Sequence, residues 1–274
     1  TGGISVGAAF LSTIIPGILL TIIYCLLNMW FLRNNTEIKV DPPLPFKAAA
    51  KEVVVSGYHA GFALLMPIII LGAIYSGVAT PTEAAAIAVI YSIPVGLFIY
   101  KGMTFKSLGK VTIRAVTMTG SIMAVLFFLF IMSRTMILEQ VPRDLAQALL
   151  QISENKYVIL LLINLLLLVI GMIVDDISGS VLAAIIFLPI INELGIDPIH
   201  FAAVVGVNLG LGNISPPCAP MLYMAGGVSK LSLDKYIKPT LKFICLGHLP
   251  MVFLVTFVPE LSLYLPKLLM GYTG

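Results

Sequence analysis

Residues 208–217 place a backbone break inside a region that is otherwise apolar enough to cross a membrane. They read Asn-Leu-Gly-Leu-Gly-Asn-Ile-Ser-Pro-Pro, and the sequence predicts that a helix does not continue through them. The two prolines remove backbone donors and clash with the preceding turn. In hydrocarbon, each freed carbonyl group is costly unless protein, water or a ligand satisfies it. Secondary transporters place such breaks where the backbone lines an ion or substrate site, so this segment is the first candidate for a functional site.

The composition indicates an integral membrane protein. Of the 274 residues, 59% are hydrophobic and 11% are charged, whereas a typical soluble domain carries about 25% charged residues. Some apolar runs reach the roughly 20 residues that a spanning helix needs, and shorter ones suggest half-helices or re-entrant hairpins. Because no run alternates between polar and apolar residues as a strand would, we predict an all-α, multi-pass protein. The apolar runs cover residues 6–32, 62–76, 83–100, 117–138, 157–174, 177–191, 201–211 and 243–258.

The charged residues carry information about topology. Residues 101–114 contain four basic residues and no acid, and residues 230–242 contain four lysines. Both segments are expected in the cytoplasm by the positive-inside rule. The net charge of +3 does not indicate nucleic-acid binding, because the basic residues cluster beside membrane segments. The chain begins at Thr1 without a basic region, so we predict no signal peptide and expect that an N-terminal portion is missing.

Residues 157–191 predict two apolar helices joined by a polar tip, Asp-Asp-Ile-Ser-Gly-Ser at 175–180. Two full crossings would leave this tip in a short cytoplasmic loop, and a re-entrant hairpin would place it near the middle of the bilayer. A carboxylate at membrane depth is costly and marks an ion or proton pathway by default. Hard cations such as sodium prefer the carboxylate, hydroxyl and carbonyl oxygens that this tip supplies. The alternative is a solvated loop between two ordinary spans.

Two further patterns concern the organisation of the chain. Residues 2–5, Gly-Gly-Ile-Ser, recur as Gly-Gly-Val-Ser at 226–229, and each copy leads to a proline and a membrane helix. This indicates an internal repeat whose second copy is complete. Residues 80–83, Thr-Pro-Thr-Glu, predict the capped start of a helix, and ion binding or gating is the alternative role for them.

A series of motifs follows along the chain: Gly-Val-Ala-Thr-Pro-Thr-Glu-Ala-Ala-Ala at 77–86, Gly-Met-Ile-Val-Asp at 171–175, Leu-Gly-Ile-Asp-Pro-Ile-His-Phe at 194–201, Asn-Leu-Gly at 208–210, Ser-Pro-Pro at 215–217 and Phe-Val-Pro-Glu-Leu-Ser at 257–262. Together they resemble the large membrane subunit of tripartite ATP-independent periplasmic (TRAP) transporters. Each motif alone is weakly specific, but the ordered set is highly specific and covers essentially the whole chain.

The resemblance implies an elevator-type transporter in the bacterial inner membrane. Two inverted repeats would each supply a re-entrant hairpin and a broken helix to a mobile transport domain, which slides against a static scaffold. The implied partners are a small four-helix membrane (Q) subunit and a periplasmic substrate-binding protein that delivers an organic anion. A sodium gradient would drive uptake, so Na+ is the implied coupling ion and no organic cofactor is expected.

The resemblance also implies that the hairpin tip faces a helix that is unwound at residues 210–217. A half-helix starting near Pro217 would present its positive N-terminal end to the anion. Of the two tip carboxylates, Asp175 is expected to be the more important. The predicted sodium ligands are Asp175, Asp176, Ser178, Gly179, Ser180, Gly210 and Asn213. The predicted substrate residues are Asn208, Gly212, Ser215, Pro216, Pro217 and Cys218, and Thr80, Thr82 and Glu83 are additional candidates for gating or ion binding.

The predicted organisation combines these elements. Amphipathic surface helices are expected at residues 46–58 and 104–114. Residues 1–60 would end the first repeat with a membrane helix and an amphipathic connector, and residues 61–116 would hold scaffold membrane helices and a cytoplasmic amphipathic segment. Residues 117–156 would form an arm helix and a periplasmic connector. Residues 157–238 would form the second half of the transport domain, with a hairpin at 157–192 and a broken helix at 198–227, and residues 239–274 would form the final membrane helix.

We therefore predict a membrane subunit of a sodium-coupled importer of an organic anion. Residues 215–219, Ser-Pro-Pro-Cys-Ala, depart from the Thr-Pro-Pro-Val-Gly that is common in the family. Because of this departure, we favour a sialic acid-like sugar acid slightly over a C4-dicarboxylate as the substrate. A non-transporting membrane scaffold and an ion channel are the alternatives. No nucleophile elbow, phosphate loop or metal motif appears in the sequence, so we predict that the chain is not an enzyme.

Overall fold

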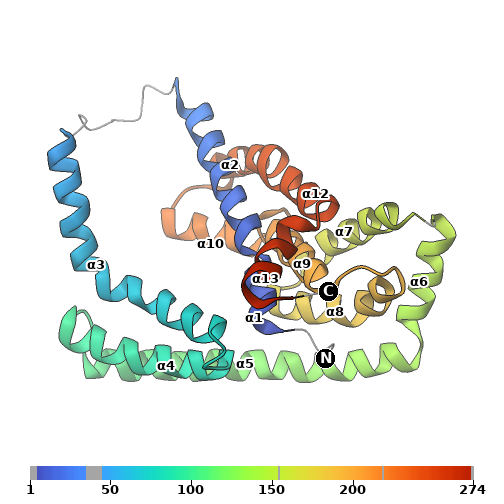
Figure 1. Cartoon of the computed structure of the whole chain (residues 1–274), viewed down its shortest axis with the longest axis horizontal. Helices are drawn as coiled ribbons and strands as arrows, with labels where there is room; N and C mark the ends of the chain where they lie inside the picture. Colours follow the sequence, from blue (N-terminus) through green and yellow to red (C-terminus); the bar gives the residue numbers. More distant parts are fainter. Residues whose placement is uncertain (1–4, 35–44, 154, 218, 273–274) are drawn as a thin grey trace. The chain divides into compact units, whose positions relative to one another are not determined.

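The computed structural model describes residues 5–34, 45–153, 155–217 and 219–272 (Figure 1). Its regular structure in these ranges is entirely helical, which confirms the predicted all-α fold for them. By length and composition, seven helical stretches of the described chain are long and apolar enough to cross a membrane, as expected of a multi-pass protein. These stretches are Val6–Leu32, Lys47–Tyr75, Pro81–Ile99, Phe105–Leu138, Lys156–Ile173, Asp176–Glu193 and Leu233–Phe257.

The chain divides into two compact units. Unit 1 combines Thr1–Arg33 with Ile122–Gly274, and unit 2 consists of Asn34–Ser121. Unit 2 holds α3 (Phe46–Tyr75), α4 (Pro81–Pro94), η1 (Val95–Ile99) and the first part of α5 (Phe105–Leu138). The other helices, all in unit 1, are α1 (Val6–Ser12), α2 (Ile14–Leu32), α6 (Val141–Ile152), α7 (Lys156–Ile173), α8 (Asp176–Glu193), α9 (Pro198–Ile214), α10 (Pro220–Ser229), α11 (Leu233–Phe243), η2 (Ile244–His248), α12 (Leu249–Phe257) and α13 (Glu260–Met270).

In unit 2, α3 packs against α4, and two tyrosine hydroxyl groups contact the middle of α3. The Tyr91 hydroxyl donates a hydrogen bond to the Phe62 carbonyl at 2.7 Å, and the Ala63 N–H donates one to the Tyr100 hydroxyl at 3.1 Å. Figure 1 shows that α3 bends along its length. Unit 2 therefore combines apolar packing with hydrogen bonds to the backbone of a bent helix.

The start of α4 confirms the predicted cap. The Thr80 hydroxyl accepts a hydrogen bond from the Glu83 N–H at 3.3 Å, and the Glu83 carboxylate accepts one from the Thr80 N–H at 2.7 Å. This reciprocal pair satisfies backbone donors that the start of a helix leaves free, and Pro81 at the first helical position needs no donor. Capping therefore explains Thr80 and Glu83, and a gating or ion-binding role for Thr80, Thr82 and Glu83 stays a prediction.

The two predicted amphipathic surface helices are not separate helices. Residues 46–58 form the first part of α3, and residues 105–114 form the first part of α5. No proline separates either amphipathic part from the apolar run after it. Since extending an existing helix is much easier than starting a new one, each pair of segments forms one long helix.

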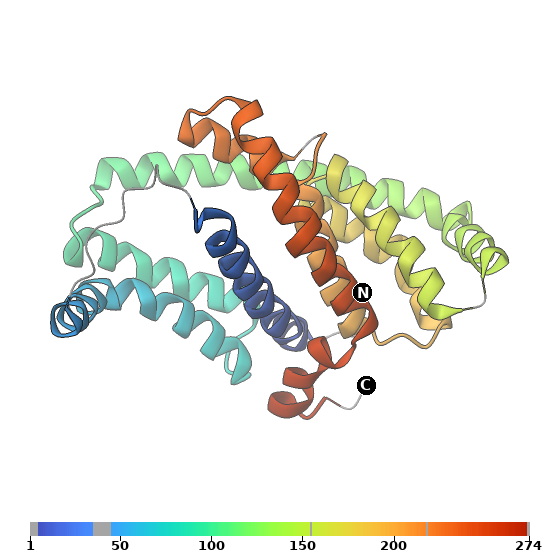
Figure 2. The ribbon, with the colours of Figure 1, turned by 90° about the horizontal axis from the view of Figure 1, so that it is seen from above.

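The last membrane helix is longer than the predicted run at 243–258. α11, η2 and α12 follow one another without a gap, and Figure 2 shows them as one continuous helix. In η2 the Leu249 N–H bonds to the Ile244 carbonyl, five residues earlier, which is the wider hydrogen-bond spacing of a π-turn. A separate helix, α13, follows Pro259, so the C-terminal segment contains more than the single helix that was predicted.

Unit 1 is built around α9 (Figure 1). α7 packs along it, and α1, α8, α12 and α13 also contact it. The Asp197 carboxylate caps its start, because it accepts hydrogen bonds from the Ile199 and His200 N–H groups at 2.7 and 3.2 Å. The main hydrophobic core of unit 1 includes the edge-to-face contact of Phe201 on α9 with Phe187 on α8, whose ring centroids are 6.5 Å apart.

The prediction that residues 208–217 are not helical is wrong for residues 208–214. α9 continues through both glycines and ends at Ile214, and α10 begins at Pro220 instead of near Pro217. Each interior glycine costs a helix only about 1 kcal/mol relative to alanine, and burial of α9 in unit 1 outweighs this cost. The break falls at Ser215, which has a ψ of 130°, because a following proline drives a residue out of the helical region.

Two glycines allow α7 and α9 to approach each other closely. A Cβ atom at Gly171 would lie 3.1 Å from the Leu209 Cα and 3.2 Å from the Gly212 Cα. A Cβ atom at Gly212 would overlap the backbone of Gly171. The two helices therefore touch backbone to backbone, just before the hairpin tip on α7 and just before the break that ends α9.

Candidate ion and substrate site

The hairpin tip is shorter and more regular than predicted. Only Val174 and Asp175 separate α7 from α8. The Asp175 carboxylate accepts hydrogen bonds from the Ile177 and Ser178 N–H groups at 3.1 and 3.2 Å, so Asp175 is the N-cap of α8. Because this cap starts α8 at once, residues 176–180 are helical and do not form the open backbone that was expected. Two helices joined by a tight turn are confirmed, and re-entry into the bilayer stays a prediction.

Asp176 joins the hairpin tip to the end of α9. The Asn213 side-chain NH₂ donates a hydrogen bond to Asp176 Oδ1. An ionised carboxylate can only accept hydrogen bonds, so Asn213 must turn its NH₂ group toward Asp176. The amide oxygen of Asn213 then remains available to another group. Asn213 is 5% exposed, and its Oδ1 is buried without a hydrogen-bond partner among the described residues. A buried acceptor without a partner costs about 1–3 kcal/mol, so this oxygen is suited to contact a cation.

The end of α9 makes this region more negative. Asn213 is followed by the last helical residue, Ile214, and carbonyl groups at the C-terminal end of a helix carry partial negative charge. Ser215 satisfies two of them: its hydroxyl donates to the Leu211 carbonyl at 2.7 Å and its N–H donates to the Gly212 carbonyl at 2.9 Å. Together with the Asp176 carboxylate, the end of α9 favours a positively charged ligand.

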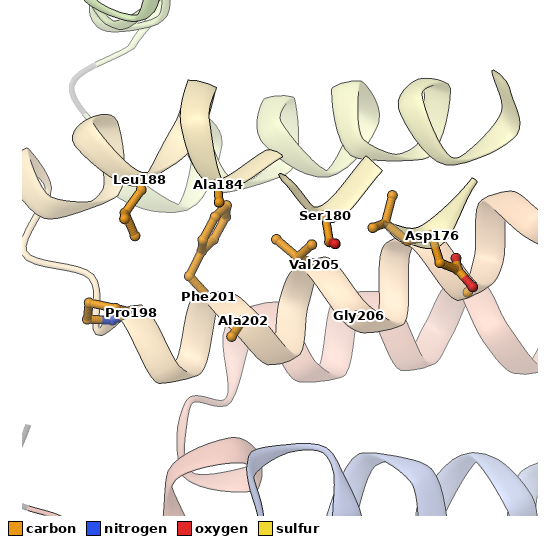
Figure 3. A pocket seen from close by; sticks show the side chains of 11 residues that line it. Asp176, Ser180, Ala184, Leu188, Pro198, Phe201, Ala202, Val205 and Gly206 are labelled. Atoms are coloured by element: carbon orange, nitrogen blue, oxygen red, sulfur yellow. The ribbon is translucent and has the colours of Figure 1, made fainter. Parts of the chain in front are cut away.

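A groove of about 470 Å³ lies between α8 and α9 (Figure 3). Asp176 and Ser180 form its polar end, and the rest of its lining, which includes Leu188, Phe201 and Val205, is mainly apolar. Small-molecule sites have volumes of about 300–1,000 Å³ and combine apolar walls with a few polar groups. The groove has both properties.

The structure brings several of the predicted sodium ligands together. Asp176, Ser180 and Gly210 line the groove, and Asn213 contacts Asp176. The other predicted ligands have local roles: Ser178 is buried, Gly179 packs against the Leu209 side chain, and the Asp175 carboxylate caps α8. Ion binding by Asp175, Ser178 and Gly179 stays a prediction.

The predicted substrate residues lie on a different side of α9, toward α7, and at the break. Asn208, Gly212, Ser215, Pro216 and Pro217 are not among the described residues that line the groove, and Cys218 lies outside the described part of the chain. Gly212 faces α7, Ser215 closes α9, and the Pro217 carbonyl accepts a hydrogen bond from the Tyr223 hydroxyl at 2.9 Å. Their participation in substrate binding stays a prediction.

Asn208 belongs to a buried polar network that the sequence analysis did not identify. Its NH₂ group donates to Asn164 Oδ1 on α7 at 2.9 Å and to the Val204 carbonyl at 2.9 Å. The Asn164 NH₂ group donates in turn to the Thr256 hydroxyl on α12 at 2.8 Å. All three polar side chains are buried. A possible signal was Asn164 itself, a single amide in an otherwise apolar run.

We expect Asn208→Leu to lower the free energy of unfolding by about 1–3 kcal/mol, because it leaves the Asn164 oxygen buried without its donor. The double variant Asn164→Leu/Asn208→Leu should cost less than the sum of the single changes, since replacing both partners by apolar groups of similar shape is nearly neutral. Denaturant unfolding of the purified protein in detergent measures these values. Strictly additive costs would show that the two amides are not coupled.

His248 holds α9 from a second direction. Its Nε2 lies 3.0 Å from the Val207 carbonyl and its Nδ1 lies 2.9 Å from the Tyr24 hydroxyl. Because a carbonyl only accepts, Nε2 carries the proton and the Tyr24 hydroxyl donates to Nδ1. His248 also lies next to Gly210, where a Cβ atom would be 3.8 Å from its ring. His248 is buried, and both of its ring nitrogens have hydrogen-bond partners in unit 1.

Fold and site together define a class of protein. The chain is a multi-pass helical membrane protein in which a carboxylate contacts an amide near the point where an apolar helix breaks, and a hydroxyl group lines the same groove as the carboxylate; this organisation is typical of secondary transporters. A family model described as "Tripartite ATP-independent periplasmic transporter, DctM component" matches residues 1–261. The chain belongs to this family, which confirms the resemblance seen in the motifs, and its members are transporter permeases and not enzymes.

Three relatives have different substrates in their names. The chain is 33% identical over 263 residues to the C4-dicarboxylate TRAP transporter large permease protein DctM of Pseudomonas aeruginosa. It is 34% identical over 277 residues to the sialic acid TRAP transporter large permease protein SiaM of Vibrio cholerae, and 32% identical over 263 residues to the isethionate TRAP transporter permease protein DctMQ of Oleidesulfovibrio alaskensis. These alignments cover 96%, 98% and 95% of this chain but 60%, 61% and 40% of the relatives. The chain therefore spans only part of their length.

Proposed function

We propose that the chain acts in the membrane permease of a sodium-coupled importer of organic anions that works by an elevator mechanism in the bacterial inner membrane. Family membership supports the transporter role. The names of the three relatives support the substrate class, because C4-dicarboxylates, sialic acid and isethionate are all organic anions. Within this class, a sialic acid-like sugar acid or a C4-dicarboxylate is the proposed substrate.

The contact between Asp176 and Asn213 is the observation that carries the sodium proposal. Asp176 supplies a carboxylate, Asn213 a buried amide oxygen without a partner in the described chain, and Ser180 a hydroxyl on the same groove. These are the oxygen types that hard cations prefer. The partial negative charge at the end of α9 adds to the attraction. Sodium, as the co-transported ion, would be held by these groups.

The same groove gives a physical reason for coupling between the ion and the anion. An anion placed near the Asp176 carboxylate is repelled unless a positive charge lies close by. A cation at Asp176 and Asn213 would replace this repulsion by attraction, so that each ligand would raise the affinity for the other. Across the break, α10 begins at Pro220, and its first N–H groups supply partial positive charge that also suits an anion.

An elevator mechanism requires a transport domain that moves without deforming. The backbone contact of Gly171 with Gly212 and the network of Asn164, Asn208 and Thr256 support such rigidity, because they hold α7, α9 and α12 together. The proposed partners are a small four-helix membrane (Q) subunit, supported by the relative named DctMQ, and a periplasmic binding protein, supported by the description of the family.

The test is uptake of labelled sialic acid, C4-dicarboxylate and isethionate into proteoliposomes that contain the assembled permease. The periplasmic binding protein is added outside, and an inward sodium gradient is imposed or omitted. We expect uptake of one of these anions only when both are present. Flux that needs neither would support an ion channel, and no uptake of any of them by an intact complex would favour the scaffold alternative.

A further inference from the structure

α11 carries a basic side that the proposed transport site does not use. Lys235, Lys238 and Lys242 follow one another at intervals of three and four residues, which places them on one side of the helix. All three are exposed, and so is Lys230, which lies shortly before the helix. We call Lys235, Lys238 and Lys242 the basic face of α11.

The basic face is not neutralised within the described part of the chain. Among the described residues, the ion pair that the structure contains joins Lys267 to Glu260, both on α13 and not on α11, at 2.9 Å. Asp234 is the single acid on α11, and no ion pair of the described residues connects it to a lysine. The basic face therefore keeps a net positive charge toward its surroundings.

Aromatic contacts fix α11 beside the end of α2. The Phe243 ring meets the rings of Tyr24 and Phe31 edge-to-face, with centroids 5.6 and 5.4 Å apart. The ammonium group of Lys242 lies 5.6 Å from the centroid of the Phe31 ring, close enough for a cation–π interaction. The basic face is therefore anchored to a second helix and has a defined position.

The residues around this corner are typical of a membrane–water boundary. Trp30 lies near the end of α2, and Arg33 follows the last residue of that helix, a position where aromatic and basic residues are enriched. Leu233, Ile237 and Leu241 recur at intervals of four on a different side of α11 from the lysines. A helix with one apolar and one lysine-rich side is suited to the headgroup layer.

We propose that the basic face of α11, together with Lys230 and Arg33, binds the headgroups of anionic phospholipids. Charge complementarity identifies this occupant, because several exposed cations along one edge of a membrane helix match a layer of lipid phosphate groups. A lysine close to an anionic membrane surface strengthens binding by about fivefold. Because the aromatic contacts already fix α11, lipid binding does not carry the entropy cost of ordering that a flexible basic segment would have.

Lipid bound at α11 also holds the helix that follows the break at Ser215. α10 contacts α11, and the close point is Gly226, where a Cβ atom would lie 2.5 Å from Cζ of Tyr236. The beginning of α10 at Pro220 is close in sequence to the break. The headgroup site thereby connects the composition of the membrane to the position of α10.

The test measures lipid binding to the intact permease, so its result does not depend on the proposed transport activity. The permease is placed in phosphatidylcholine nanodiscs with or without phosphatidylglycerol, and native mass spectrometry counts the lipids that stay bound. In Lys235→Gln/Lys238→Gln/Lys242→Gln we expect retention of phosphatidylglycerol to fall at least about tenfold, with retention of phosphatidylcholine unchanged. Lys156→Gln/Lys267→Gln, which changes two lysines of unit 1 outside α11, should retain phosphatidylglycerol like the unmodified protein.

A triple lysine-to-arginine variant keeps the charge and should keep the bound lipid, and a thermal melt in phosphatidylcholine checks that each variant is folded. If the glutamine variant does not fold, a salt series on the unmodified permease decides instead, since retention must weaken as salt screens the charges. The proposal is overturned if lipid retention does not depend on salt, or if a folded glutamine variant retains phosphatidylglycerol normally. It is also overturned if inorganic phosphate displaces the lipid completely, because that result would indicate a site for free phosphate.

Discussion

Asp176→Asn is expected to raise the sodium concentration needed for half-maximal uptake at least about tenfold. The change keeps the shape of the side chain that contacts Asn213 but removes the charge that faces the groove. Interactions with a charged group are worth about 1.5–3 kcal/mol, and 1.4 kcal/mol corresponds to a factor of ten in affinity. Uptake by the assembled permease in proteoliposomes, measured over a series of sodium concentrations, gives the value.

Asp175→Asn is the matched control for this experiment. Asparagine is as good an N-cap as aspartate, so the start of α8 should persist and the sodium dependence should change much less than in Asp176→Asn. A larger effect of Asp175→Asn would contradict our assignment from the geometry and support the ranking expected from the family resemblance. Similar losses in both variants would indicate that the two carboxylates hold the ion together.

Gly212→Ala is expected to lower the free energy of unfolding by about 3 kcal/mol. The added methyl group would overlap the backbone of Gly171, and a backbone cannot move aside as the end of a flexible side chain can. Overpacking of a closely packed core typically costs about 1–3 kcal/mol, and this position belongs at the upper end of that range. Denaturant unfolding of the purified protein in detergent measures the change.

Gly17→Ala in α2 is the control for Gly212→Ala, because apart from its chain neighbours and the adjacent backbone of its own helix no atom of the described chain lies within 4 Å of the position that its Cβ would take. Alanine is favoured over glycine inside a helix by about 0.5–1 kcal/mol, so this variant should be as stable as the unmodified protein or slightly more stable. If Gly212→Ala proved as stable as Gly17→Ala, α7 and α9 would not meet backbone to backbone.

Much of the fold follows from local features of the sequence. The apolar runs predict the membrane helices, Thr80 and Glu83 predict the cap of α4, and the acidic pair at 175–176 marks the turn between α7 and α8. Each of these signals acts within a few residues, through helix capping or through the length of an apolar run. Local chemistry of this kind can be recognised without knowledge of the packing.

The candidate site was predicted less completely because it depends on packing between distant segments. The residue types at 208–217 predicted that the helix stops within this segment, but contacts with α7 keep α9 helical as far as Ile214. The pairing of Asn164 with Asn208, and of Asp176 with Asn213, joins residues far apart in the sequence. Sequence patterns identified Asp176, Asn208 and Asn213 as important polar residues but could not show which residues each of them contacts.

The π-turn in η2 determines the rotational register of the last membrane helix. Each residue of an α-helix advances the direction of its side chain by about 100°, and the wider turn accommodates one extra residue. Deleting one residue from η2 should therefore be absorbed, because the turn contracts to regular α-helical spacing and the lysines of α11 keep their direction relative to Met251 and Val255, which are buried after the turn. The same deletion after the turn, in α12, meets no wider turn that can contract, and it would rotate one side of the helix against the other by about 100°. Within the last membrane helix, η2 is thus the place where the loss of one residue should be tolerated best.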